Sequence, residues 1–284
     1  MERLSSEIVA EGFFFLEGPR WHEGRLWFSD MMGGVVYALD GEGRSEAIVA
    51  VPERPSGLGF LPDGTPLVVS MRDRCLYRIE AGALALHADL SDLAAGDTND
   101  MVVDAQGRAY IGNMGFDYWQ DPDAFVPSTV IAVEPDGAAR IAADGFDFLN
   151  GMAIDSNTGR LIVAESYGKR LKALDIEADG RLANPCTFAD LGDHTPDGIC
   201  LDAEGAVWVA AYLQGVFLRV QEGGAISCLV TPTARRAVAC QLGGDDGRTL
   251  YCLTSSGGSE RRRAAEKGGR VESLRVAVPG AGSP

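Results

Sequence analysis

The chain has 284 residues, 46% of them hydrophobic and 23% charged, so it is long enough to bury a full core, and we expect one domain over residues 1–284. Its formal net charge of −16 repels phosphate backbones and anionic membrane surfaces, which argues against nucleic acid and membranes as partners. A metal cation or a neutral small molecule suits this charge balance better.

We expect neither a signal peptide nor a membrane-spanning segment. Residues 1–20 hold acidic side chains where a signal peptide needs basic and then apolar ones, and no apolar run approaches the roughly 18 residues of a membrane span. The six cysteines show no CxxC or Cys/His clustering, which favours free thiols, mostly buried, over disulfides or zinc. We therefore expect a cytoplasmic protein that is a monomer or a weak homo-oligomer.

A unit of strand, turn and strand recurs six times along the chain. In order, the copies read EGPRWHEGRLWFSD from Glu17, SGLGFLPDGTPLVVSM from Ser56, NDMVVDAQGRAYIGNM from Asn99, NGMAIDSNTGRLIVAES from Asn150, DGICLDAEGAVWVAAY from Asp197 and ACQLGGDDGRTLYCLTS from Ala239. Successive copies start 39 to 51 residues apart, close to the roughly 40 to 45 residues of a four-stranded propeller blade. Turns such as PDGT and DAEGA supply the Asp and Gly that tight hairpins need.

Further short strands are expected between the repeated units. They lie at residues 35–40, 75–80, 130–135, 170–176 and 216–221. No helical periodicity appears beyond one possible turn near residues 91–95, which argues against a barrel of alternating strands and helices. The sequence therefore predicts an all-β fold, a six-bladed β-propeller with four-stranded blades around a central tunnel.

The two ends of the chain are predicted to close the ring. Residues 5–10 and 269–278 are the candidate strands, because pairing them removes an open sheet edge. The segment GGSERRRAAEKGG, residues 257–269, is polar and flanked by glycine, so we expect it to be a solvated loop.

The first residues of the six units should face one another around the tunnel. This set, called the ring below, comprises Glu17, Ser56, Asn99, Asn150, Asp197 and Ala239, and four of its six members carry a carboxylate or an amide. Two carboxylates without a basic partner are costly in a tunnel unless a cation lies between them. Oxygen ligands favour a hard divalent ion such as calcium, magnesium or manganese over zinc, which usually recruits His or Cys. Alternatively, these side chains only cap strand ends.

The quoted segments, together with TPDGICLDAEGAVWVAAYLQG, resemble the senescence marker protein, gluconolactonase and luciferin-regenerating enzyme family, a group of calcium-dependent phosphotriesterase-type propellers. The likeness runs in order from about Glu11 to Ser255. It implies one divalent ion, calcium, magnesium, manganese or zinc, held by a Glu, an Asn and an Asp, which fall on Glu17, Asn150 and Asp197. The family's proposed general base falls on Asp197 as well.

The resemblance also suggests where substrate binds. The family's Asn beside the metal falls on Asn99, which in related fluorophosphatase propellers is a fourth ligand, so either role is possible. An acid near the substrate falls on Asp117, in the loop of residues 115–127 where relatives place a lid. Trp119 in that loop is a further candidate contact, and its aromatic neighbours suggest a less polar pocket, or else they only pack the loop onto the propeller.

One position departs from the pattern of the family. Where its sugar lactonases often have an Arg two residues before the substrate Asn, this chain has Asp97, which disfavours an acidic or phosphorylated substrate. The resemblance predicts a metal-dependent hydrolase, a lactonase that opens a lactone or a related ester. Phosphotriester hydrolysis and a non-catalytic calcium-binding propeller are the alternatives.

Overall fold

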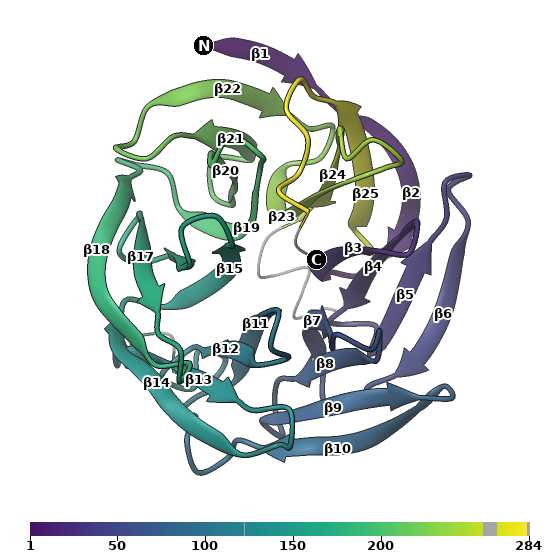
Figure 1. Ribbon diagram of the computed structural model, residues 1–284. Helices are drawn as coiled ribbons and strands as arrows, with labels where there is room; N and C mark the ends of the chain where they lie inside the picture. Colours follow the sequence, from purple (N-terminus) through teal and green to yellow (C-terminus); the bar gives the residue numbers. More distant parts are fainter. Residues whose placement is uncertain (122, 258–265, 283–284) are drawn as a thin grey trace.

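The computed structural model describes residues 1–121, 123–257 and 266–282. The elements assigned in these residues are all β-strands, and they form six sheets arranged around a central axis (Figure 1). The predicted six-bladed β-propeller is therefore confirmed. No helix in the described ranges is long and apolar enough to cross a membrane.

Blades one to three each contain four consecutive strands, ordered from the tunnel outward. They are β3 (Leu16–His22), β4 (Arg25–Asp30), β5 (Val35–Leu39) and β6 (Ser45–Ala50); β7 (Pro55–Phe60), β8 (Pro66–Ser70), β9 (Cys75–Glu80) and β10 (Ala83–Asp89); β11 (Thr98–Val103), β12 (Ala109–Asn113), β13 (Ser128–Val133) and β14 (Ala139–Phe146). Neighbouring strands within each blade are antiparallel.

Blades four to six follow the same plan, except that the start of the chain joins the last two. Their consecutive strands are β15 (Leu149–Asp155), β16 (Arg160–Glu165), β17 (Arg170–Ile176) and β18 (Leu182–Asp190); β19 (Pro196–Leu201), β20 (Val207–Ala211), β21 (Val216–Val220) and β22 (Ile226–Thr231); β23 (Arg236–Gly243), β24 (Thr249–Ser255) and β25 (Gly269–Arg275). The strands expected between the repeated units are all present, with ends shifted by no more than two residues.

The amino-terminal strands close the ring, as predicted. Strand β2 (Glu7–Phe13) pairs antiparallel with β25 and completes blade six. Strand β1 (Glu2–Ser5) runs parallel to β22 and adds a fifth strand to blade five, which the sequence did not predict. The amino terminus therefore joins two neighbouring blades (Figure 1). Most of the basic segment 257–269, expected to be a solvated loop, lies outside the described residues.

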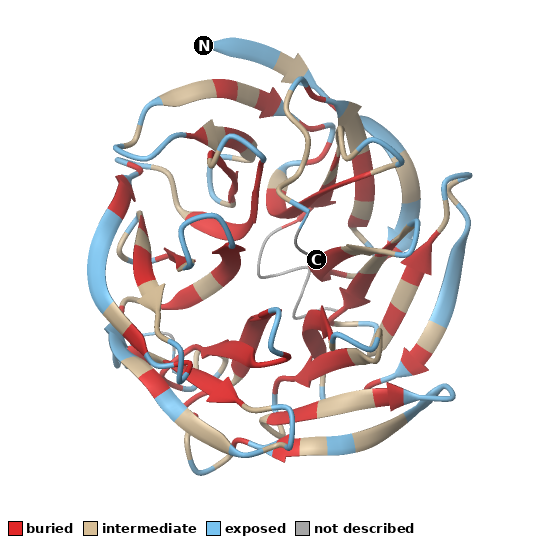
Figure 2. Cartoon of the chain, viewed as in Figure 1, coloured by how far each residue is buried: buried red, intermediate tan, exposed pale blue. Residues whose placement is uncertain are grey.

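Apolar side chains fill each of the six interfaces between neighbouring blades. For example, Leu67 and Val69 of blade two pack with Met101 and Ile111 of blade three in one buried cluster. Five further clusters join the other pairs of blades around the ring. Burial is greatest near the tunnel, whereas the outer strands β6 and β18 carry exposed stretches (Figure 2). The blades thus hold the inner strands rigidly around the axis.

The cysteines belong mainly to this core. All six are free thiols, of which five are buried and Cys186 is exposed. Cys200, Cys228, Cys240 and Cys252 pack in the cluster between blades five and six. The expectation of free thiols, mostly buried, is therefore confirmed.

Candidate functional site

Five of the six ring residues occupy one place in the blade, whereas the sixth, Ala239, is the fourth residue of β23 and packs in the apolar cluster between blades six and one. Glu17, Ser56, Asn99, Asn150 and Asp197 are each the second residue of an innermost strand, namely β3, β7, β11, β15 and β19. In every one of these strands the pairing with the next strand shifts register at this point. Such bulges redirect side chains and are common beside binding sites. Here they turn the strand ends toward the tunnel.

Glycines next to the ring residues allow the inner strands to touch. Gly18, Gly57, Gly151 and Gly198 each follow a ring residue. A Cβ on Gly57 would lie 2.4 Å from the Met101 nitrogen, and one on Gly151 would lie 2.5 Å from the Ile199 nitrogen. Since backbone cannot yield at such distances, only glycine permits this approach. The close contact of neighbouring strands brings the ring side chains together at one mouth of the tunnel.

A chain of hydrogen bonds joins blades two, three and four at the ring. Ser56 Oγ donates to Asn99 Oδ1 at 3.2 Å, and Asn99 Nδ2 donates to the Leu149 carbonyl at 3.2 Å and more weakly to Asn150 Oδ1 at 3.4 Å. Asn150 Nδ2 in turn donates to Ser166 Oγ at 3.3 Å. Because both amide nitrogens donate to protein, the orientation of both amides is set, and each amide oxygen has a second lone pair for a ligand.

The ring forms part of the floor of a cavity of about 200 Å³. Four of its members line this cavity: Glu17, Asn99, Asn150 and Asp197. Asn99 is 4% exposed and Asp197 is 7% exposed, so both polar groups are largely withdrawn from solvent. The wall consists mainly of Met31, Met71, Met114, Tyr118, Trp119, Phe148, Tyr167, Tyr212 and Leu213. The cavity therefore combines a polar floor with an apolar wall.

The loop of residues 115–127 contributes to both packing and lining. Phe116 is buried and packs against Phe148, with ring centroids 6.0 Å apart, whereas Tyr118 and Trp119 line the cavity. The Arg54 guanidinium lies 4.5 Å from the centre of the Trp119 ring. The loop thus serves both purposes considered for it: Phe116 packs it onto the propeller, and Tyr118 and Trp119 make the pocket less polar.

Asp117 lies outside the described lining of the cavity. It is exposed, and its Oδ1 accepts the backbone N–H groups of Trp119 and Gln120 at 3.2 and 3.1 Å. Its carboxylate therefore stabilises the turn that presents Trp119. A contact of Asp117 with substrate stays a prediction.

Asp97, which replaces the expected arginine, is half-buried beside this turn. Burial raises its pKa, an effect opposed by the Arg54 charge and the Trp119 side chain and reinforced by Asp117. Asp97 and Arg54 thus belong to a charged group behind Trp119. Neither residue lines the cavity in the described part of the chain.

Sequence reasoning missed the three methionines of the wall. Met31, Met71 and Met114 each directly follow the second strand of a blade, after β4, β8 and β12. The same place holds Ser166 in blade four and Tyr212 in blade five. A signal was available, because this column can be read from the repeat as directly as the ring column.

The donor set of the ring fits a hard divalent cation. Two carboxylates and two amide oxygens line one cavity, and calcium, magnesium and manganese accept such oxygen ligands. Within the described ranges, no three His, Cys, Asp or Glu side chains form a metal-binding group, so the amides would have to complete the coordination. None of the three histidines lines the cavity, which does not favour zinc.

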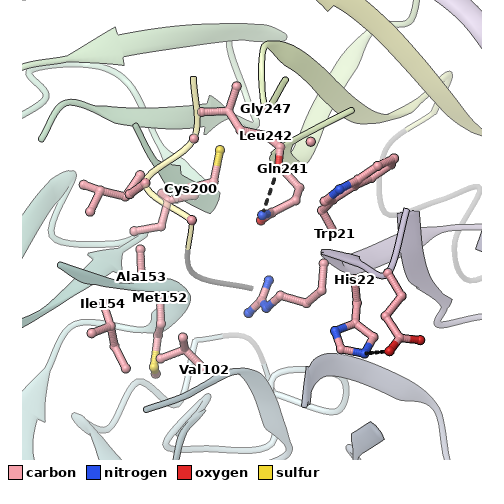
Figure 3. A pocket seen from close by; sticks show the side chains of 18 residues that line it. Trp21, His22, Val102, Met152, Ala153, Ile154, Cys200, Gln241, Leu242 and Gly247 are labelled. Atoms are coloured by element: carbon pink, nitrogen blue, oxygen red, sulfur yellow. Dashed lines mark hydrogen bonds and ion pairs between the residues drawn. The ribbon is translucent and has the colours of Figure 1, made fainter. Parts of the chain in front are cut away.

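A second cavity, of about 300 Å³, opens at another part of the inner strands (Figure 3). Trp21, His22 and Gln241 line it, and the His22 ring stacks on Phe60 at a centroid distance of 3.7 Å. Arg20 also lines it, and Arg20 Nη2 donates to Asp100 Oδ1 at 2.9 Å. Strand β3 thus places Glu17 in one cavity and a charge-compensated Arg20 in the other.

The fold and this site define a class: a six-bladed propeller with a ring of oxygen-bearing side chains in a cavity at the tunnel. The chain belongs to the SMP-30/gluconolactonase/LRE-like family, whose model matches residues 15–256. The resemblance read from the repeated segments is therefore confirmed.

Individual relatives are similar over nearly the full chain. It is 28% identical to a 6-deoxy-6-sulfogluconolactonase of Pseudomonas putida over 298 aligned residues, which cover 98% of this chain and 96% of that protein. It is 26% identical to regucalcin of Xenopus laevis, covering 96% and 95%. The crystal structure of a calcium-binding regucalcin from Agrobacterium tumefaciens superimposes with a TM-score of 0.84 at 22% identity, covering 100% and 97%, which supports the fold.

Proposed function

We propose that this protein is a divalent-metal-dependent lactonase. The observation that carries the proposal is the placement of Glu17, Asn99, Asn150 and Asp197 together on the floor of one cavity. The family includes proteins named as lactonases, such as the sulfogluconolactonase of Pseudomonas putida. Glu17, Asn150 and Asp197 would hold the cation, and Asn99 would contact either the cation or the substrate.

The reaction is hydrolysis of a cyclic ester. Water attacks the carbonyl carbon, so a new carbon–oxygen bond forms and the ring carbon–oxygen bond breaks. The Asp197 carboxylate accepts a proton from the attacking water and returns it to the leaving ring oxygen, so the product is a hydroxy acid. A bound hard cation supplies Lewis-acid stabilisation of negative charge on the carbonyl oxygen.

The chain's own residues supply orientation and exclusion of water. The hydrogen bonds from Ser56 to Asn99 and from Asn150 to Ser166 hold the floor in one arrangement before substrate arrives. Preorganised polar groups of this kind spend no free energy on reorientation during the reaction. The methionine and aromatic wall lowers the local dielectric constant, which strengthens electrostatic interactions at the floor.

The test uses purified protein stripped of metal by a chelator. Calcium, magnesium, manganese or zinc is added back singly, and acid release from a panel of γ- and δ-lactones is followed at constant pH. The proposal expects hydrolysis that requires added metal. Hydrolysis of aryl phosphotriesters but not of lactones would favour the phosphotriesterase alternative. A metal-dependent rise in melting temperature without hydrolysis of any ester would favour a non-catalytic calcium-binding propeller.

A further inference from the structure

The methionines form one arc of the cavity wall, built by three consecutive blades. Each backbone N–H donates to the carbonyl of the residue two positions before the ring. These bonds are 2.8 Å from Met31 to Phe15, 2.9 Å from Met71 to Arg54 and 2.9 Å from Met114 to Asp97. The equivalent bonds from Ser166 to Phe148 and from Tyr212 to Thr195 are 3.0 and 2.9 Å. Blades one to three thus present the same flexible apolar side chain at the same height above the ring.

Aromatic rings form the other side of the wall. Phe148 and Tyr167 stack with centroids 4.8 Å apart, and Tyr118 meets Phe148 edge-on at 5.4 Å. Phe148 has a φ of 64°, in the left-handed region that a bulky residue rarely adopts. Such strain persists where the surrounding structure imposes it, often at binding sites. Here the strained residue is two positions before Asn150 and lines the cavity.

The methionine arc of the wall offers a ligand no hydrogen-bond donor, and the polar groups of the wall belong to Tyr118, Trp119, Tyr167, Thr195 and Tyr212 outside this arc, together with Ser166. The Ser166 hydroxyl donates to the Pro196 carbonyl at 2.7 Å and accepts from Asn150, so its proton is already used. Asn99 and Asn150 belong to the floor, where Asn99 donates both amide protons within the protein and Asn150 donates one to Ser166. Sugar-type hydroxyls placed against the methionine arc would lose water without gaining a partner, which opposes binding.

We infer that the substrate of this site is a lactone that carries a hydrocarbon chain rather than a polyhydroxylated one. The inference rests on the proposed lactonase function and adds its substrate class. The lactone ring reaches the polar floor, and its chain packs against Met31, Met71 and Met114. Methionine suits this task because its unbranched, polarisable side chain adapts to chains of different shape.

The experiment compares two six-membered lactones with the metal-loaded protein. One is glucono-δ-lactone and the other is a δ-lactone with a pentyl chain next to the ring oxygen. We expect kcat/KM to be at least tenfold higher for the pentyl lactone. Met31→Gln should reduce that preference at least fivefold, whereas Leu86→Gln, at an exposed apolar side chain of the outer strand β10, should leave it unchanged. Hydrolysis of gluconolactone at an equal or higher kcat/KM would overturn the inference and leave the lactonase function standing.

A second readout does not depend on turnover or on variants that fold. The pentyl-substituted lactam and gluconolactam, which resist hydrolysis, are titrated while tryptophan fluorescence is recorded, because Trp119 lines the cavity. We expect the pentyl lactam to bind at least tenfold more tightly. If no lactone is hydrolysed, the proposed function fails, and the lactam comparison then decides the ligand class. Equal binding of the two lactams, or tighter binding of gluconolactam, would overturn the inference that the site prefers a hydrocarbon chain.

Discussion

Ser6 Oγ donates a hydrogen bond of 2.7 Å to Glu272 Oε2 and so ties the start of the chain to its last strand. The Glu272 carboxylate also accepts the Thr233 backbone N–H and hydroxyl, both at 2.8 Å, and the Thr254 hydroxyl at 2.9 Å. These donors come from the junction of β1 and β2, from the connection between blades five and six, and from β24. One buried carboxylate therefore joins the segments that close the propeller.

Glu272→Gln should destabilise the fold by about 2 to 3 kcal/mol, because it replaces a charged acceptor with an amide that faces several donors. Burial alone would raise the pKa of Glu272, but the hydrogen bonds from Thr233, Ser6 and Thr254 outweigh it and lower the pKa below that of an ordinary glutamate. The folded pKa is the lower one, so this stabilisation is present above the unfolded pKa and is lost as pH falls through the folded pKa.

Urea unfolding of both proteins from pH 7 to pH 3 checks this. The stability gap between wild type and Glu272→Gln should be constant near neutral pH and shrink below about pH 4.3, the ordinary pKa of a glutamate. Glu7→Gln is the matched control, because Glu7 is an exposed carboxylate of the closing strand β2. A gap that does not change with pH would remove Glu272 from this role.

Gly151→Ala should damage stability and the site together. Its Cβ would lie 2.5 Å from the Ile199 nitrogen and 2.8 Å from the Asp197 carbonyl oxygen, so strands β15 and β19 must separate. We expect a loss of at least about 2 kcal/mol in the free energy of unfolding, as for other overpacked positions, together with weaker metal binding. Denaturant unfolding and calorimetric metal titration measure the two effects. Gly41→Ala, which meets nothing within 4 Å, should change neither.

Asp197→Asn should keep the fold and lower kcat by about 10²- to 10⁴-fold, the usual value of a general base. Steady-state kinetics at saturating metal measures this, and circular dichroism checks the fold. Asp193→Asn, at an exposed carboxylate on the connection that precedes β19, is the control and should retain full turnover. Turnover near the wild-type value in Asp197→Asn would exclude this residue as the base.

Glu17→Gln should weaken metal affinity because it removes one of the two carboxylates from the cavity floor. Calorimetric titration with calcium, magnesium and manganese should show an increase in Kd of at least about tenfold for the ion that supports activity, since loss of one charged ligand exceeds about 1.4 kcal/mol. Glu23→Gln, at an exposed carboxylate in the turn after the same strand, is the control. Unchanged affinity in Glu17→Gln would contradict the ligand assignment.

Thiol labelling of the folded protein should show one fast cysteine. Cys186 is exposed, whereas burial raises the pKa of the Cys75 and Cys228 thiols and raises those of Cys240 and Cys252 well above the ordinary value. Because the thiolate is the reactive form, the buried thiols should react only as the protein unfolds. Cys186→Ser should abolish the fast phase in a colorimetric thiol assay. A second fast thiol among Cys200, Cys228, Cys240 and Cys252 would contradict the packing between blades five and six.

The repeat made much of the architecture predictable from the sequence. Asp and Gly mark the hairpin turns, and apolar strands flank them at a nearly regular period, so equivalent positions in six units had to face one axis. That equivalence brought Glu17, Asn99, Asn150 and Asp197 to one cavity, as the ring column predicted. The family followed from the same segments and is confirmed over residues 15–256.

Tertiary structure alone decided the remainder. Strand β1 pairs with β22 of blade five, which lies more than 200 residues away in sequence. No local sequence pattern encodes a pairing between segments so far apart. Asp117 is exposed to solvent, whereas Trp119 lines the cavity. The sequence could not distinguish these two directions, because a loop lacks the alternation that assigns the side chains of a strand to its two faces. The repeat thus establishes which residues are equivalent, whereas the packing of distant segments places some of them in the cavity and makes its wall apolar.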